Sequence, residues 1–301
     1  MKWIEPGLVA ELDAGGTTAH RVFSAEDAWI ERFGGTAVIS VKERDAADRL
    51  LGQLDRWLER AALSVPRIYL RHLVRQPREN DQPVLLRGDA GGPTKETVRE
   101  SGLLYEVDFA TGYSVGLFCD QRANRRHLRT LAPKRLLNTF SYTCAFSVAG
   151  ATEGAETLSI DLSKSSLTRG RRNFELNGFD AARHRFLADD VLGVLPRLAG
   201  RDEKFDAIIL DPPTFGRSSP RKAFRAARDY EDLIVQAVAC AAPGASLLLS
   251  TNCSALTTDK LCSMGARVAR GKATFHREPP QPDYPPGHGS ATVWMRLKST
   301  R

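Results

Sequence analysis

From about Arg122 onward the sequence alternates between short apolar runs with the length of strands and amphipathic stretches with the length of helices. The expected strands are 135–138, 156–160, 184–187, 205–210 and 245–250, and the expected helices end at 131 or cover 146–153, 164–177, 191–198 and 230–241. Such alternation predicts an α/β fold with a parallel, doubly wound sheet. The tail, with runs at 273–277 and 291–297 around a proline-rich loop, predicts a closing antiparallel pair.

The first hundred residues predict a small α+β domain. They contain apolar runs at 37–41 and 67–73 on either side of a helical pattern at 45–62. A loop at 81–95, rich in Asp, Gly and Pro, follows and is either a flexible connection or a long hairpin. Runs at 103–109 and 114–119 predict a hairpin with its turn at 110–113. We therefore expect one domain at 1–100 and a second at 101–301.

Composition limits which compartments and which cofactors are expected for this protein. No apolar run approaches the roughly 20 residues that span a bilayer, and the N-terminus lacks the apolar core of a signal peptide, so we expect a cytoplasmic protein with no membrane partner. The five cysteines form no CxxC pair, and His72, His127 and His184 have no acid or cysteine nearby in sequence. We therefore expect neither disulfides nor a metal.

The net charge of +7 favours an anionic partner. RNA or DNA phosphate is a better candidate than a membrane, because no basic cluster adjoins an exposed apolar face. The basic residues gather in three clusters, namely Arg122, Arg125, Arg126, Arg129, Lys134 and Arg135; Arg169, Arg171 and Arg172; and Arg217, Arg221, Lys222, Arg225 and Arg228.

The segment Asp211-Pro212-Pro213 closes the apolar run 205–210 in an unusual way. Proline has no backbone donor and biases the preceding residue toward extended conformations, so the pair ends the strand and stiffens the loop after it. In open α/β sheets, ligands bind outside the carboxyl ends of the strands. The segment is either a simple strand-ending turn or a rigid loop that presents a carboxylate to a flat polar group.

Two further acidic positions come after strands of the same sheet. Asp161 ends the second strand, at the position where an acid accepts hydrogen bonds from ribose hydroxyls, and the first strand-to-helix turn at 138–146 has no GxGxxG. This favours a ribose-bearing ligand without phosphates, such as S-adenosylmethionine. Asp189 or Asp190, after the third strand, can bond the adenine amino group or simply cap the next helix, and register favours Asp190.

At this point the chain resembles the class I S-adenosylmethionine-dependent methyltransferases that modify large-subunit ribosomal RNA. The cytosine carbon-5 branch is most similar and the guanine branch second. The resemblance covers roughly the last 200 residues, and implies a Rossmann-like doubly wound sheet, mostly parallel, after a small α+β domain. An additional N-terminal RNA-binding domain of many members is expected to be absent. The stretches that carry the resemblance are GLFCDQRANR (116–125), LLNTFSYTCAFSVAGATEGAETLSIDLSKSSL (136–167), NFELNGFD (173–180) and FDAIILDPPTFGRS (205–218).

The resemblance implies roles for particular residues. The cofactor would be contacted by Asp120 and Arg122 at its methionine end, by Phe140, Ser141 and Tyr142 around it, by Asp161 and the adjacent Leu162 at the ribose, by Asp189 or Asp190 near adenine, and by Asp211 beside the reacting centre. Relatives usually carry glycine where this chain has Cys144-Ala145. A larger residue there could narrow the turn and weaken cofactor binding.

Methylation of cytosine carbon-5 needs a thiolate that adds to carbon-6 of the ring. Cys253 lies just beyond a strand end, where the cytosine branch carries its nucleophile, and exposure and nearby arginines would favour its thiolate. The alternative is an idle, buried cysteine. The preceding Thr251-Asn252 is closer to the Asn-rich guanine branch, in which Asp211 and the Pro212 carbonyl would orient the base without a nucleophile.

Substrate contacts are expected from the residues after Asp211. Pro212 and Pro213 would hold the base, and Phe215 would stack on it or belong to the core. Arg217, in the basic loop 216–228, would bind flanking phosphates. Thr214 separates the second proline from the aromatic residue, which disfavours adenine amino methylation. A small-molecule or protein methyltransferase, an inactive cofactor-binding protein, and a monomer or homodimer all stay open.

Overall fold

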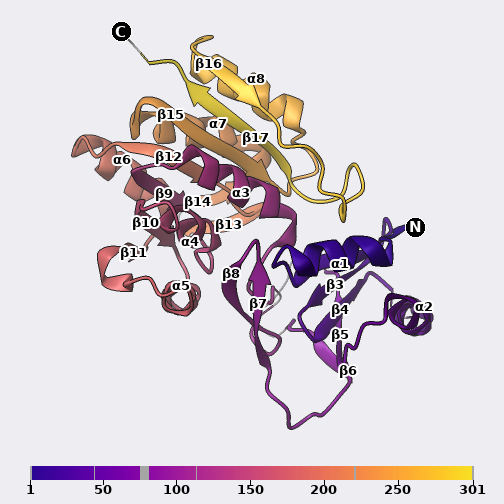
Figure 1. The fold of residues 1–301 in the computed structure, drawn as a ribbon. Coiled ribbons are helices and arrows are strands. Elements are labelled where there is room, and N and C mark those ends of the chain that lie inside the picture. Colours follow the sequence, from indigo (N-terminus) through magenta and orange to yellow (C-terminus); the bar gives the residue numbers. More distant parts are fainter. Residues whose placement is uncertain (1, 44, 75–80, 113, 220–221, 300–301) are drawn as a thin grey trace. The chain divides into compact units, whose positions relative to one another are not determined.

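A computed structural model describes residues 2–43, 45–74, 81–112, 114–219 and 222–299, and within 215–219 and 222–223 it describes the backbone alone. The chain forms two compact units (Figure 1). The first contains residues 1–122 together with 280–288, and the second contains 123–279 together with 289–301. The division therefore falls later than residue 100, and the first unit takes a segment from the far end of the chain.

The first unit contains a six-stranded sheet with the strands in chain order. Only β4 and β5 are parallel neighbours, because α2 crosses between them. The strands are β1 (Lys2–Trp3), β2 (Ala19–Ser24), β3 (Ala28–Phe33), β4 (Thr36–Val41), β5 (Arg67–His72) and β6 (Val84–Arg87), with helices α1 (Pro6–Ala14) and α2 (Asp45–Ala61). This confirms the expected elements around α2, while β6 lies in a segment expected to be a loop.

The helix α2 shows why its sequence is helical. Leu50, Leu54, Trp57 and Leu58 are buried, and their spacing of three and four residues places them on one face. The indole N–H of Trp57 donates to the carbonyl of Ile4 over 3.0 Å. The apolar face therefore packs into the core of the first unit.

The expected hairpin of 103–109 with 114–119 is wrong. The strand β8 (Leu103–Asp108) pairs instead with β7 (Lys95–Glu100), which precedes it. The two residues between them, Ser101 and Gly102, have φ of 50° and 83°. Positive φ at both positions belongs to the tight turn whose twist matches a two-residue hairpin. The pair Ser-Gly was the local signal for this pairing.

The second unit contains a seven-stranded sheet in the order β11-β10-β9-β12-β15-β17-β16. The first five strands are parallel, β17 is antiparallel to β15, and β16 is antiparallel to β17. The strands are β9 (Arg135–Thr139), β10 (Glu156–Asp161), β11 (Arg185–Ala188), β12 (Phe205–Leu210), β15 (Ala241–Thr251), β16 (Ala273–His276) and β17 (Ala291–Leu297). The doubly wound sheet and its antiparallel closing pair are thus confirmed.

Helices cover both faces of this sheet, since side chains alternate along each strand. Leu137, Ile208 and Leu247 pack with α6, α7 and α8, whereas Leu136 and Ile209 pack with α3 and α4 on the other face. The helices are α3 (Arg122–Leu131), α4 (Ala145–Ala151), α5 (Lys164–Leu176), α6 (Val191–Gly200), α7 (Ala226–Ala239) and α8 (Thr258–Val268), with a short 3₁₀ turn η2 (Ala181–Arg183). A further 3₁₀ turn, η1 (Cys119–Gln121), lies in the first unit just before α3. A hairpin of β13 (Phe215–Ser219) and β14 (Lys222–Arg225) precedes α7.

Among the residues that the structure describes, no helix is long and apolar enough to cross a lipid bilayer.

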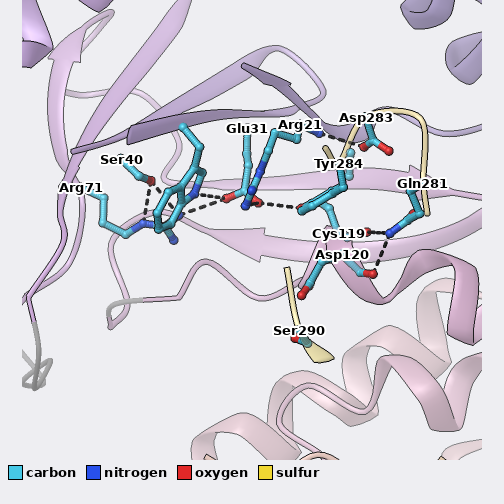
Figure 2. Close-up of polar contacts among 12 residues, drawn as sticks. Arg21, Glu31, Ser40, Arg71, Cys119, Asp120, Gln281, Asp283, Tyr284 and Ser290 are labelled. Atoms are coloured by element: carbon cyan, nitrogen blue, oxygen red, sulfur yellow. Dashed lines mark hydrogen bonds and ion pairs between the residues drawn. The ribbon is translucent and has the colours of Figure 1, made fainter. Parts of the chain in front are cut away.

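The far segment 280–288 belongs to the first unit through buried polar contacts (Figure 2). Asp283, which is fully buried, pairs with the guanidinium of Arg122 and accepts the backbone N–H of Arg21 over 3.1 Å. The hydroxyl of Tyr284 donates to Glu31 over 3.1 Å, and the Arg21 guanidinium lies 4.2 Å from the centre of the Tyr284 ring. The first unit is therefore discontinuous in sequence.

Glu31 is the centre of this buried network. Its carboxylate bonds Arg71 over 3.0 Å and Arg21 over 3.4 Å. Burial alone would raise the pKa of Glu31, but the two guanidinium groups and the Tyr284 hydroxyl together hold its pKa below the ordinary value. Glu31 is therefore a paired, ionised residue inside the first unit.

Candidate active site

The turn between β9 and α4 has an unusual backbone. Phe140, Tyr142 and Cys144 have φ of 52°, 47° and 61°, the left-handed region that non-glycine residues rarely adopt. Each such residue costs on the order of 1–3 kcal/mol and persists only where its surroundings hold it. Backbone strain of this kind gathers at ligand-binding sites, and here it lies at the carboxyl end of the first parallel strand.

Asp161 holds this turn against the end of β10. Its two carboxylate oxygens accept the backbone N–H of Tyr142 and of Ser163, both over 2.8 Å, while the N–H of Ser141 donates to the carbonyl of Ile160 over 2.9 Å. Burial raises the pKa of Asp161, and the two N–H groups offset part of the rise. Each carboxylate oxygen has a further lone pair, so the group can still accept ribose hydroxyls.

The Cys144 side chain is accommodated behind the turn. It is fully buried, and a Cβ added to Gly170 of α5 would lie 2.4 Å from its sulfur. Asn173, one turn further along α5, donates to the carbonyl of Thr143 over 2.9 Å. The sulfur therefore occupies the space that glycine leaves on α5, and burial raises the pKa of the thiol to about 12. The effect of Cys144 and Ala145 on cofactor affinity stays a prediction.

The residues expected near ribose and adenine lie at the ends of β10 and β11. Leu162, directly after Asp161, is 56% exposed and can cover an apolar ligand face. Asp190 caps α6 by accepting the N–H of Leu192 over 3.1 Å, and burial raises its pKa. Asp189 pairs with Arg197, whose hydrogen bond lowers the pKa of Asp189. Both acids thus have structural partners, and their role toward adenine stays a prediction.

Asp211 lies at the end of β12 and is fixed by β15. The Ser250 hydroxyl donates to its carboxylate over 2.6 Å. Pro212 is buried and Pro213 is exposed. Since neither proline has an N–H, the ladder between β12 and β15, which pairs Leu210 with Leu249, cannot continue in the usual way.

The hydroxyl of Tyr230, on α7, bonds the backbone of both strands where their ladder of hydrogen bonds stops. This buried hydroxyl accepts the N–H of Ser250 over 2.7 Å and lies 2.8 Å from the Ser250 carbonyl and 3.0 Å from the Leu210 carbonyl. Burial raises the pKa of this hydroxyl well above its ordinary value, so it stays a proton donor. Sequence reasoning treated Tyr230 only as the start of a helix, because its two contacts lie 20 residues away in either direction.

Cys253 follows the end of β15, as expected, but its predicted exposure is wrong. It is 7% exposed and belongs to the apolar cluster that also contains Leu256. Its N–H donates to the Thr251 hydroxyl over 3.1 Å, and its carbonyl accepts the N–H of Leu256 over 2.9 Å. This turn reverses the chain after β15 and places the thiol within the apolar cluster.

The loop expected at 216–228 is partly the β13–β14 hairpin. The side chains of Phe215 and Arg217 lie outside the described residues, as do Arg221 and the Lys222 side chain, so their substrate contacts stay predictions. Arg228 pairs with Asp229, which also accepts the Arg225 N–H over 2.9 Å.

The basic cluster at 122–135 is largely used within the fold, which corrects its interpretation as a free phosphate-binding surface. Arg125 is buried with its guanidinium 5.6 Å from the centre of the Phe146 ring, and Arg129 pairs with Glu153. Arg135 donates to the Lys204 carbonyl over 2.7 Å. On α5, Arg171 and Arg172 are exposed, although the Arg171 guanidinium lies 4.2 Å from the centre of the Phe186 ring and Arg172 pairs with Glu175.

Asp120 and Arg122 belong to the first unit. Arg122 is 5% exposed and pairs with Asp283, and the Asp120 carbonyl accepts the side-chain N–H of Gln281 over 2.6 Å (Figure 2). Both residues therefore help to hold the far segment 280–288. Their expected place at the methionine end of the cofactor stays a prediction.

A cavity of about 300 Å³ lies elsewhere, near the amino ends of β9 and β12. Its lining includes Lys134, Asp206 and Arg296. Ligands of doubly wound sheets bind at the carboxyl ends, so this cavity is separate from the candidate active site.

The direction in which successive strands are added to the sheet changes between β9 and β12, and carboxylates lie at the ends of β10 and β12. This arrangement is the Rossmann-like architecture of class I methyltransferases. Residues 35–297 match the S-adenosylmethionine-dependent methyltransferase family. The chain belongs to this family, and its cofactor is S-adenosylmethionine.

Curated relatives are named as ribosomal RNA large subunit methyltransferases. YwbD of Bacillus subtilis is 41% identical over 166 residues, which cover 54% of this chain and 42% of YwbD. The protein named ribosomal RNA large subunit methyltransferase I of Aeromonas salmonicida is 38% identical over 172 residues, which cover 56% of this chain and 43% of that protein. The matched region thus spans less than half the length of these relatives.

Solved structures have the same fold. SMU.776 complexed with SAH superimposes with a TM-score of 0.82 at 24% identity, covering 97% of this chain and 78% of that chain. The S-adenosylmethionine-dependent methyltransferase of Agrobacterium tumefaciens superimposes with a TM-score of 0.72 at 20% identity, covering 95% of this chain and 91% of that chain.

Proposed function

We propose that this chain transfers a methyl group from S-adenosylmethionine to a base of large-subunit ribosomal RNA. The observation that carries the proposal is the carboxyl edge of the second unit's sheet, where Asp161 after β10 and Asp211 after β12 flank the strained turn after β9. The name of the Aeromonas salmonicida relative, ribosomal RNA large subunit methyltransferase I, supports the RNA substrate. When bound, the cofactor supplies an electrophilic methyl group.

The proposed division of labour is based on the contacts. Asp161 accepts the ribose hydroxyls, and Leu162 covers an apolar face of the cofactor. Asp211, fixed by Ser250, and the Pro212 carbonyl orient the base by hydrogen bonds. Tyr230 keeps the ends of β12 and β15 in register, so that these groups hold their positions.

Carbon-5 of cytosine is the favoured target, with Cys253 as nucleophile. In that reaction the thiolate of Cys253 adds to carbon-6, carbon-5 takes the methyl group, a base removes the carbon-5 proton, and the thiolate leaves. The position of Cys253 after β15, three residues beyond the serine that holds Asp211, supports this assignment. The thiol has to become accessible when RNA binds.

Direct methylation of guanine is the second candidate. The burial of Cys253 in an apolar cluster favours it, because direct transfer to guanine needs no accessible nucleophile. Asp211 and the Pro212 carbonyl would then orient the guanine, and no covalent bond to the protein would form.

Mass spectrometry of nucleosides distinguishes the targets. Deproteinised 23S RNA is incubated with the protein and S-adenosylmethionine, then digested. We expect 5-methylcytidine from the wild type and none from Cys253→Ser, with Cys262→Ser as the matched control that retains activity. Methylguanosine from both cysteine variants would establish the second candidate, and no methylated nucleoside in RNA or in assembled subunits would refute the proposal.

A further inference from the structure

Two imidazoles and a carboxylate converge in the second unit, outside the candidate active site. His127 lies on α3, His276 ends β16, and Glu278 lies two residues later. One oxygen of Glu278 lies 2.9 Å from Nδ1 of His127 and 2.6 Å from Nε2 of His276. One potential ligand atom of each residue lies within 4.8 Å of the other two.

We propose that His127, His276 and Glu278 bind a divalent transition-metal ion such as Zn²⁺. Imidazole nitrogen and carboxylate oxygen are ligands that Zn²⁺ takes, and three protein ligands leave a fourth position for water. Bonds of 2.0–2.2 Å in a tetrahedron separate the ligand atoms by about 3.3 Å. The two carboxylate–imidazole distances thus need to open by about 0.5 Å.

The surroundings hold two of the three ligands in place. The His127 ring lies 4.9 Å from the His276 ring and 5.0 Å from the ring of Trp294, and the Trp294 indole donates to Asn124 over 3.0 Å. The side chains of His127 and Glu278 are only 20% and 14% exposed. His276 is 56% exposed, so its ring can turn to complete the coordination.

Neighbouring charge leaves the carboxylate available for an ion. Arg277, which stands between two of the ligands in sequence, pairs with Asp259 of α8 and contacts the Cys262 sulfur over 3.6 Å. Glu278 itself contacts the two imidazoles, and a divalent cation would lie among these three groups.

A bound ion would join two distant parts of the second unit. His127 lies on the helix that follows the passage of the chain out of the first unit, and Glu278 lies just before the chain returns there at Pro280. Since an ion that binds only the folded state stabilises it by mass action, metal should raise the melting temperature.

The test uses the full, untagged chain stripped of metal with a chelator. We expect calorimetric titration with ZnCl₂ to show one site, and Co²⁺ to give the visible absorption of a tetrahedral nitrogen–oxygen site. His276→Ala, at the most exposed ligand, and Glu278→Gln should each weaken Zn²⁺ binding at least tenfold and abolish the increase in melting temperature.

Two variants serve as controls. Cys262→Ser removes the half-buried thiol near Arg277, and His288→Asn removes a histidine of the first unit. Both should bind Zn²⁺ like the wild type. Absence of wild-type binding, or binding that survives His276→Ala and Glu278→Gln, would show that the three residues form hydrogen bonds only and would overturn the proposal.

Discussion

A single hydroxyl connects the two loops that carry the proposed chemistry. The Tyr230 oxygen bonds the backbone of Ser250 and faces the Leu210 carbonyl, at the place where Pro212 cannot continue the ladder. The sequence indicated that Asp211 and its prolines form a functional strand exit. It could not indicate Tyr230, because a buried hydroxyl bond to a distant backbone leaves no local pattern.

We expect Tyr230→Phe to lower the free energy of unfolding by about 1–3 kcal/mol, because it removes the hydroxyl that bonds buried backbone groups of Ser250 and Leu210. The methylation kcat should fall while the KM for S-adenosylmethionine changes little, since Asp161 is untouched. Urea unfolding and steady-state kinetics measure both effects. Tyr69→Phe, in the first unit, is the control, and a kcat equal to that of the wild type would contradict the positioning role.

The ionisation of Asp161 should make the affinity for S-adenosylmethionine depend on pH. Burial raises its pKa above the ordinary 3.8, and only the ionised form accepts hydrogen bonds from both ribose hydroxyls. Cofactor affinity should therefore be complete above the raised pKa and decline as the pH falls through it, earlier than an ordinary aspartate would allow. Calorimetry across this pH range should show an affinity for S-adenosylmethionine that does not change with pH in Asp161→Asn. If the wild type and Asp161→Asn lost affinity in parallel, Asp161 would not be the titrating group.

At the scale of elements, the strained turn depends on α5. A Cβ at Gly170 would overlap the Cys144 sulfur, so Gly170→Ala should destabilise the protein, although alanine favours helices by up to about 1 kcal/mol. In a Cys144→Gly background the same change should be neutral or stabilising. Urea unfolding of the four proteins in this double-mutant cycle measures the coupling.

A second helical glycine provides the control for that cycle. Gly193 of α6 has nothing within 4 Å of an added Cβ, so Gly193→Ala should be neutral or stabilising in either background. Equal effects of Gly170→Ala with and without Cys144 would show that the sulfur is not the cause.

Most elements of the second unit were predictable, because each strand is a short apolar run with clear turns around it. The expected 205–210 and 291–297 match β12 and β17. The sequence did not predict the β7–β8 hairpin, since four of the six residues of β7 are charged and Val98 is its one buried apolar side chain. Its pairing depends on the positive φ at Ser101 and Gly102.

At the scale of the whole molecule, the first unit is completed by residues 280–288. Nothing periodic marks this proline-rich segment, and its partners Arg21, Glu31 and Arg122 are distant in sequence. The expected division at residue 100 could not include it. A discontinuous unit also means that substitutions near the C-terminus should destabilise the N-terminal sheet.

Asp283→Ala tests this coupling, because it leaves the buried Arg122 guanidinium without its carboxylate. Breaking a buried ion pair costs about 3–5 kcal/mol, so unfolding of the first unit should shift to lower urea. Tryptophan fluorescence reports mainly on this unit, which contains Trp3, Trp29 and Trp57. The exposed Asp202→Asn should leave the transition unchanged, and an equally small shift for Asp283→Ala would refute the coupling.

We propose that S-adenosylmethionine binds at the carboxyl edge of the second unit's sheet through Asp161. Isothermal titration calorimetry of the full chain with S-adenosylmethionine tests it directly, beside Asp161→Ala and the surface control Asp202→Ala. We expect one site in the wild type and the control, and at least tenfold weaker binding in Asp161→Ala. No binding to the wild type, or equal affinity in all three proteins, would contradict the claim.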